Sequence, residues 1–274
     1  MAEHRFVTVN GIRTHYVAAG KGDPLLLLHG MGASLMAWAL NIEPLSHKFS
    51  VYAIDIPGHG DSDKPDLDYL LPTAVDFVRE FMNVLGIERA SLAGNSMGGM
   101  IALRTAVDFP ELVDRLVLVD AAGLGREVAW FIRAMSLPLV GELIENPSPR
   151  NTRALLKRIF YNPDLLQESL IRELLRTRIL PGSKRAVLRI IRGSIGLRGL
   201  HSKWMMADEL GQLNSPVLLV WGAQDRILPV SHATDAAQRA PQVSLSIYEE
   251  CGHWPQMEKG QEFNRLALEF LTEA

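Results

Sequence analysis

The sequence predicts an α/β fold in which a mostly parallel sheet is covered by helices on both faces. Short apolar runs alternate with helical patterns near both ends of the chain, and these runs are continuous instead of alternating with polar residues. Strands that are buried on both faces have this composition, and their alternation with helices favours parallel crossover connections. Between residues 122 and 212 the strand signal vanishes, which predicts a helical insertion.

The elements follow in order along the chain. The first two expected strands, 6–9 and 12–17, are joined by Asn10-Gly11, the strongest short hairpin signal. Four consecutive leucines at 25–28 predict a strand with two buried faces. Further strands are expected at 51–54, 90–93, 116–119, 217–221 and 244–248. Helices are expected at 73–85, which ends at Gly86, at 97–107, which ends near Pro110, and at 261–271.

These elements divide the chain into three segments. Residues 1–122 and 211–274 are expected to form the two parts of an α/β core, and residues 123–210 a helical cap. Open α/β sheets bind ligands beyond the carboxyl ends of their strands, where a lid excludes water. The inserted segment is basic, because residues 126–203 hold 15 Lys and Arg against 6 Asp and Glu. This charge is either a solvated helix surface or an attraction for an anionic substrate or an acidic surface.

The composition excludes several classes of protein. A hydrophobic fraction of 47% and a charged fraction of 22% are typical of a folded globular chain. The single cysteine, Cys251, excludes an intrachain disulfide and a cysteine-based zinc site. No apolar window is long enough to insert into a membrane, and no secretory signal is recognised, so a cytoplasmic location is expected. Binding to nucleic acid is not expected, because the net charge is −3 and the basic residues are not interleaved with aromatic ones.

One motif points to a nucleophile. The strand at 90–93 runs into Gly-Asn-Ser-Met-Gly at 94–98 and then into a helix. This G-x-S-x-G pattern between strand and helix predicts a sharp turn that lifts the Ser96 hydroxyl above the sheet. Small residues are needed at 94 and 98 because the backbone packs closely around the serine. The N-terminus of the following helix favours developing negative charge, so Ser96 is the candidate nucleophile.

A serine hydroxyl needs a base, and on this type of scaffold the chain order is Ser, acid, His. Of the three histidines after Ser96, His253 is the candidate base because it lies in a loop just after the last expected strand. His201 lies in the insertion. His232 is expected on the first turn of a helix, in an exposed structural role.

Two aspartates compete to orient that histidine. Asp225 follows the strand at 217–221 through a glycine-containing loop and is favoured over Asp120, which is expected to bind backbone N–H groups of a loop. A carboxylate bonded to Nδ1 of His253 leaves Nε2 to accept the serine proton. The oxyanion formed by attack needs backbone donors, which are expected from the amides of Met31 and Met97.

Three segments together resemble the α/β-hydrolase superfamily. They are His-Gly-Met-Gly at 29–32, Gly-Asn-Ser-Met-Gly-Gly at 94–99 and Gly-His at 252–253. Asp-Ile-Pro-Gly-His-Gly-Asp-Ser at 55–62 also resembles the loop after the fourth strand of that superfamily. The resemblance covers nearly the whole chain outside the insertion. It implies an eight-stranded, mostly parallel sheet with a helical cap, and a site without a cofactor or metal.

Within the superfamily, the chain is most similar to the meta-cleavage-product hydrolases, which split C–C bonds in vinylogous 1,5-diketo acids. The tail at 251–266 resembles their C-terminal signature, and an asparagine beside the nucleophile and a tryptophan beside the base also match. Glu-Leu-Leu-Arg-Thr-Arg at 173–178 resembles the segment that supplies their substrate-binding arginine. The substrate-binding residues implied by the resemblance are Gly30, Asn95, Arg178 and Trp254.

One loop departs from that family's pattern. Residues 32–38 read Gly-Ala-Ser-Leu-Met-Ala-Trp, where the family carries Pro-Gly and then an asparagine. Two small-molecule substrates are therefore left open, a small carboxylic ester or a vinylogous diketo acid. A lipase-like enzyme at lipid surfaces and a receptor-like ligand-binding member with slow turnover are the rival functions. Self-association into a homo-oligomer is also left open.

Overall fold

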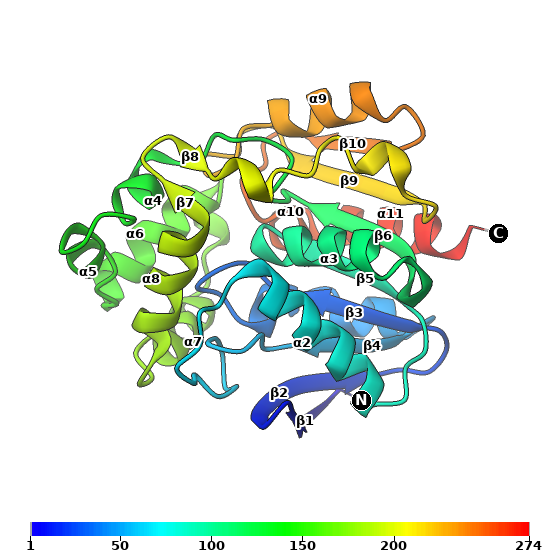
Figure 1. Ribbon diagram of the computed structural model, residues 1–274, viewed down its shortest axis with the longest axis horizontal. Coiled ribbons are helices and arrows are strands. Elements are labelled where there is room, and N and C mark those ends of the chain that lie inside the picture. Colours follow the sequence, from blue (N-terminus) through cyan, green and yellow to red (C-terminus); the bar gives the residue numbers. More distant parts are fainter. Residues whose placement is uncertain (1, 274) are drawn as a thin grey trace.

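The core of the molecule is an eight-stranded sheet in the order β1-β2-β4-β3-β5-β6-β9-β10, as a computed structural model describes it for residues 2–273 (Figure 1). β1 pairs with β2 and β2 with β4 in antiparallel fashion, and all other neighbours in this sheet are parallel. The strands are β1 Glu3–Val9, β2 Ile12–Ala19, β3 Pro24–Leu28, β4 Ser50–Ile54, β5 Ala90–Asn95, β6 Val113–Val119, β9 Val217–Gly222 and β10 Ser244–Tyr248. This arrangement confirms the predicted fold class.

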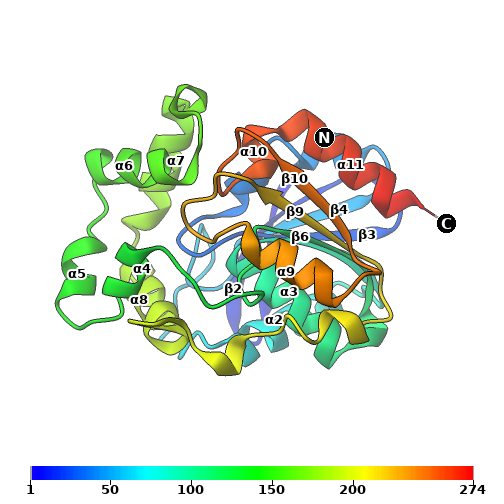
Figure 2. The same ribbon diagram turned by 90° about the horizontal axis from the view of Figure 1, so that it is seen from above.

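Helices cover both faces of this sheet (Figure 2). The leucines of β3 alternate between two apolar clusters, with Leu26 and Leu28 on one face and Leu25 and Leu27 on the other. The first cluster includes side chains of α2, α3 and α9, and the second includes side chains of α1 and α11. The bounds are α1 Ile42–Ser46, α2 Leu71–Val84, α3 Met97–Asp108, α9 Ser231–Arg239, α10 Pro255–Glu258 and α11 Gly260–Thr272. Burial on both faces explains why the strand is apolar at every position.

The chain between β6 and β9 forms a mainly helical insertion at one end of the sheet (Figures 1 and 2). Its elements are α4 Trp130–Ala134, α5 Val140–Ile144, α6 Pro149–Ile159, α7 Glu168–Arg178, α8 Ser183–Ser194, β7 Ile195–Gly196 and β8 Gly199–Leu200. Short 3-10 helices occur at Leu35–Trp38, Pro110–Leu112, Pro163–Leu165, Ser202–Trp204 and Leu210–Gln212. The antiparallel pair of β7 and β8 was not expected from the sequence, because each strand has two residues and leaves no periodic signal.

The expected elements outside the insertion are all present, and their ends differ by a few residues. The hairpin at Asn10 and Gly11 has φ values of 50° and 78°, as the predicted turn requires. β1 begins at Glu3 rather than residue 6, because polar side chains on this edge strand hide the strand pattern. Among the described residues, no helix combines the length and the apolar composition needed to cross a bilayer.

Candidate active site

Ser96 occupies a sharp turn between β5 and α3. Its φ of 56° and ψ of −116° lie in a region that L-residues rarely adopt. A Cβ at Gly94 would lie 2.3 Å from the carbonyl oxygen of Gly98, and a Cβ at Gly98 would lie 2.1 Å from the carbonyl oxygen of Leu28. Only glycine fits at both positions, which is the close packing that the sequence pattern predicts.

His253 and Asp225 are joined by a hydrogen bond. His253 Nδ1 lies 2.7 Å from Asp225 Oδ2, and the two side chains are 5% and 0% exposed. A carboxylate can only accept, so the imidazole proton is on Nδ1 and Nε2 is left with a free lone pair. The second carboxylate oxygen accepts from the backbone N–H of Ile227 at 2.7 Å. The backbone N–H of His253 donates to the carbonyl of Ile159 in the insertion at 2.7 Å, which ties the histidine loop to the insertion.

Ser96 and His253 line the same cavity, which has a volume of about 380 Å³. Apolar side chains of the insertion make up much of its wall, including those of Phe131, Ile132 and Leu155. No hydrogen bond joins Ser96 Oγ to His253 Nε2 within residues 2–273. Catalytic hydrogen bonds are often long before substrate binds, so a shared cavity is the relevant geometric criterion here.

The loop after β3 approaches the serine closely. A Cβ at Gly30 would lie 3.2 Å from the Cβ of Ser96, and both Gly30 and Met31 line the cavity. The Met97 amide is the first of α3, where helix N–H groups have no partner in the helix. Neither this N–H nor that of Met31 donates a hydrogen bond to an acceptor in the described chain. Both donors are therefore free to meet an oxyanion.

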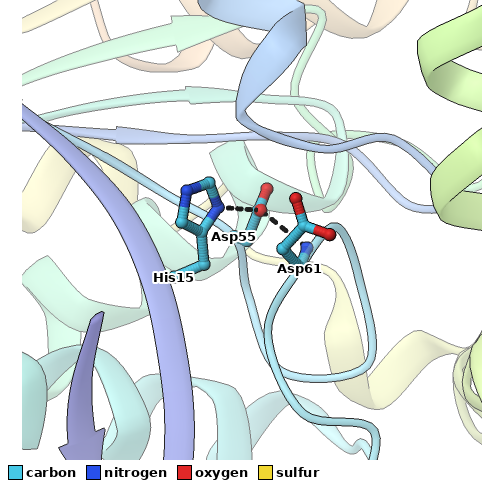
Figure 3. A group of neighbouring side chains, drawn as sticks. All are labelled: His15, Asp55 and Asp61. Carbon is cyan, nitrogen blue, oxygen red and sulfur yellow. Dashed lines mark hydrogen bonds and ion pairs between the residues drawn. The ribbon is translucent and has the colours of Figure 1, made fainter. Parts of the chain in front are cut away.

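Asp55 anchors this loop (Figure 3). Its carboxylate accepts from His15 Nδ1 at 2.6 Å, from the Leu35 N–H at 2.8 Å and from the Asp61 N–H at 2.9 Å. Burial raises the pKa of Asp55, but these hydrogen bonds and the nearby histidines outweigh it and lower the pKa below its ordinary value. Asp55 therefore ties the loop after β4 to β2 and to the loop after β3.

The spacing of His15, Asp55 and Asp61 is also compatible with a metal ion (Figure 3). Both oxygens of Asp61 accept from Arg176 of α7, at 2.8 and 2.7 Å, and that hydrogen bond lowers the pKa of Asp61. The oxygens of both carboxylates already accept hydrogen bonds. Through Asp61 and Arg176 the cluster connects the core to the insertion. It does not offer the open oxygen ligands that a hard cation needs.

Asp120 lies beside the histidine–aspartate pair. One of its oxygens accepts from the Gly222 N–H at the end of β9 at 3.2 Å, where N–H groups of a loop were expected, and the other is buried without a partner among the described residues. Complete burial, and then the Asp225 carboxylate, raise the pKa of Asp120 well above its ordinary value. Asp120, Asp225 and His253 have metal-compatible spacing, but the raised pKa of Asp120 disfavours the charged form that binds a cation, and His253 is already bonded to Asp225.

Three of the four expected substrate-binding residues line the cavity, and the fourth does not. Gly30, Trp254 and Arg178 line the cavity. Asn95 is fully buried, and its Nδ2 donates to the carbonyls of Val119 at 3.2 Å and His253 at 3.1 Å. Its side chain does not line the cavity; it connects the nucleophile strand to the histidine loop.

Two residues were missed by sequence reasoning, one that lines the cavity and one that supports the histidine loop. Glu145 lines the cavity and pairs with Arg178, with Arg178 Nη2 donating to Glu145 Oε1 at 2.5 Å. Glu258 accepts from the backbone N–H groups of Gly252 and Tyr161 at 2.8 and 2.7 Å, which links the histidine loop to the insertion. Burial raises the pKa of Glu258 despite these bonds. Glu145 is marked by no motif, whereas Glu258 lies within the C-terminal signature.

Two other histidines near the site have structural contacts. His29 is fully buried, its Nδ1 bonds the carbonyl of Gly30 and its Nε2 accepts from the Ile56 N–H. The prediction that His232 would be exposed is wrong, since it is 3% exposed and its Nε2 lies 2.9 Å from Glu127. Its ring packs under the insertion, a contact that local sequence does not encode.

Comparisons with known proteins show which family this fold resembles. A 2-hydroxy-6-oxononadienedioate/2-hydroxy-6-oxononatrienedioate hydrolase of Comamonas testosteroni is 30% identical, over 98% of this chain and 96% of that protein. A solved meta-cleavage product hydrolase from Pseudomonas fluorescens superposes with a TM-score of 0.85 and 29% identity, covering 97% of both chains. A solved carboxylesterase from Bacillus subtilis has a TM-score of 0.81 and 26% identity, covering 99% of this chain and 92% of its own.

The family assignment rests on a match over most of the chain. Residues 25–266 match the family described as "Alpha/beta hydrolase family", a span that includes both the strand–turn–helix at Ser96 and the histidine loop. The two hydrolases named above align with this chain over nearly the whole length of both proteins, and both are named for small-molecule substrates. The chain therefore belongs to the alpha/beta hydrolase family.

Proposed function

We propose that this protein hydrolyses a small carbonyl compound through a covalent acyl-enzyme formed on Ser96. The observation that carries the proposal is a single cavity lined by both Ser96 and His253, with Asp225 fixing the tautomer of His253 from behind. His253 Nε2 removes the proton from Ser96 Oγ as the oxygen attacks the carbonyl carbon. The amides of Met31 and Met97 receive the negative charge that forms on the carbonyl oxygen.

The remaining steps use the same groups. His253 gives its proton to the leaving group, the tetrahedral intermediate collapses, and the acyl group stays on Ser96. A water molecule then transfers a proton to His253 and attacks the acyl carbon. The second tetrahedral intermediate collapses, His253 returns the proton to Ser96 Oγ, and the acid is released. Asp225 keeps the imidazolium oriented and stabilised throughout. We also propose that the insertion, residues 123–210, acts as a cap that limits access of water to the cavity.

A small carboxylic ester is the first candidate substrate, because the cavity wall is largely apolar and the chemistry needs only carbonyl attack. The C–C bond of a vinylogous diketo acid is the second candidate, and it is favoured by the relatives that are named for such substrates. In that reaction His253 would first promote ketonisation of the substrate before the carbonyl is attacked.

A substrate panel tests the proposal. Purified protein is assayed with p-nitrophenyl esters of graded acyl length and with a chromophoric 2-hydroxy-6-oxo-dienoate, in parallel with the Ser96→Ala variant. We expect turnover of at least one compound and a loss of at least about 10³-fold in kcat for Ser96→Ala with an unchanged Tm. Unchanged hydrolysis by Ser96→Ala would remove the serine from the mechanism. A receptor-like function instead predicts one turnover, and a lipase-like function predicts activity only on dispersed long-chain esters.

A further inference from the structure

Arg178, the cavity residue best suited to hold a substrate carboxylate, already holds one from the protein itself. Its Nη2 donates to Glu145 Oε1 at 2.5 Å, and the side chains are 11% and 5% exposed. Both residues line the cavity that contains Ser96. Arg178 is the last residue of α7 and Glu145 directly follows α5, so the insertion supplies both partners.

This pairing changes the electrostatics of the cavity. The pair is neutral as a unit, and a substrate carboxylate that approached Arg178 would also approach the Glu145 carboxylate. Repulsion between two anions is poorly screened in a partly desolvated site, so it costs binding free energy. An arginine is well suited to bind a carboxylate, and here Arg178 Nη2 already donates to the carboxylate of Glu145.

Few other charged groups face the cavity. Of the described residues that line it, the other ionisable ones are His253 and Arg158. Arg158 is exposed, and its guanidinium lies 4.7 Å from the ring centroid of Phe131 and 5.9 Å from that of Trp130. Solvent therefore screens the charge of Arg158. The buried charges of the cavity wall are those of Arg178 and Glu145, which neutralise each other.

We infer that Glu145 determines specificity: it occupies Arg178, excludes substrates that carry a carboxylate at this end of the cavity, and directs the site toward uncharged esters. This inference rests on the proposed function. It separates the chain from the acid-bearing substrates for which its relatives are named, although their overall fold is shared.

The test compares two substrates with the same chain and leaving group, p-nitrophenyl hydrogen adipate, which ends in a carboxylate, and p-nitrophenyl methyl adipate, which ends in an uncharged methyl ester. The readout is the ratio of kcat/KM for the acid to kcat/KM for the neutral diester. We expect a ratio below about 0.1 for the unaltered protein and an increase of about 10-fold or more in Glu145→Gln, which frees Arg178. The double variant Glu145→Gln/Arg178→Gln should lose most of that increase, because it removes the cation as well.

Glu142→Gln is the matched control. Glu142 lies in α5, three residues before Glu145, and is paired with Arg192 at 2.8 Å, but it does not line the cavity. The substitution removes the same charge from the same part of the chain at an exposed position, so the ratio should stay within about 2-fold of that of the unaltered protein. An equal rise in Glu142→Gln and Glu145→Gln would assign the effect to the general charge of the insertion and overturn the inference.

Two outcomes overturn the inference while the proposed function stands: an unaltered protein that prefers the acid, or a folded Glu145→Gln variant with an unchanged ratio. The first needs no variant, so it decides the matter even when Glu145→Gln does not fold. Failure of the proposed function is recognised separately, by hydrolysis that survives in Ser96→Ala. Binding of monomethyl and dimethyl adipate to Ser96→Ala, measured by calorimetry, then still tests the discrimination without turnover; tighter binding of the monoacid would contradict it.

Discussion

At the scale of single residues, the candidate site depends on a few residues whose conformation is fixed by close packing. Ser96 keeps a strained backbone because glycine on either side allows strand and helix to pack around it. These features were predictable because they lie within a short contiguous motif. The pair of Glu145 and Arg178 was not, since its two residues come from separate parts of the insertion and neither has a neighbouring pattern that marks the contact.

A second residue-scale feature is the buried histidine His59, which packs edge-on against His29. Burial, and then the neighbouring His29, lower the pKa of His59 to about 3. In the unfolded chain a histidine has a pKa near 6.5, so between about pH 6.5 and 3 the unfolded state binds more protons. The stability that His59 contributes is therefore complete above pH 6.5 and is lost as the pH falls.

This predicts a pH-dependent difference between the unaltered protein and His59→Gln. The free energy of unfolding of the unaltered protein should fall by about 2 kcal/mol more than that of the variant between pH 6.5 and 5. Urea unfolding at several pH values measures it. His47→Gln, at an exposed histidine, is the control and should follow the unaltered protein. Parallel pH profiles for all three proteins would show that His59 is not held neutral in the fold.

At the scale of elements, hydrogen bonds between the loops after β3 and β4 position the part of the chain that carries the Met31 amide. Asp55, at the end of β4, accepts hydrogen bonds from β2, from the loop after β3 and from its own loop (Figure 3). The sequence predicted the strands because their apolar runs are local. It did not predict these hydrogen bonds to Asp55, because the three donors, at positions 15, 35 and 61, are far apart from one another in the chain.

We expect Asp55→Asn to destabilise the protein by about 2–4 kcal/mol, because an amide cannot accept all of the hydrogen bonds made to a buried carboxylate. It should also lower kcat, because the loop that it anchors carries the proposed Met31 donor. Denaturant unfolding and turnover measure the two effects. Asp66→Asn is the control, since Asp66 lies in an exposed ion pair with Arg189, and it should change stability by less than about 1 kcal/mol. Similar losses in both variants would show that Asp55 is not an anchor.

At the scale of the whole molecule, the core and the insertion were predictable to different degrees. The alternation of strands and helices predicted the sheet, and the absence of strand signals predicted the mainly helical segment between β6 and β9. Within that segment the sequence did not predict the short hairpin or the way the helices close around the cavity. Helix packing depends on contacts between distant side chains, such as Arg176 with Asp61, which a periodic pattern does not specify.

The same division applies to function. The triad candidates lie in the core and are marked by motifs, whereas most residues that line the cavity lie in the insertion. A family that shares the core can therefore hold the same proposed chemistry and differ in substrate. Solved structures of similar fold include both a meta-cleavage product hydrolase and a carboxylesterase.

The most direct test of the central claim is to identify the residue that becomes covalently modified. The protein is treated with a fluorophosphonate ester, and its mass and peptides are measured by mass spectrometry. We expect a single adduct, on Ser96, that forms with loss of hydrolytic activity and is absent in Ser96→Ala. An unmodified Ser96 in protein that still turns over substrate, or an inactivating adduct on another residue, would contradict the account.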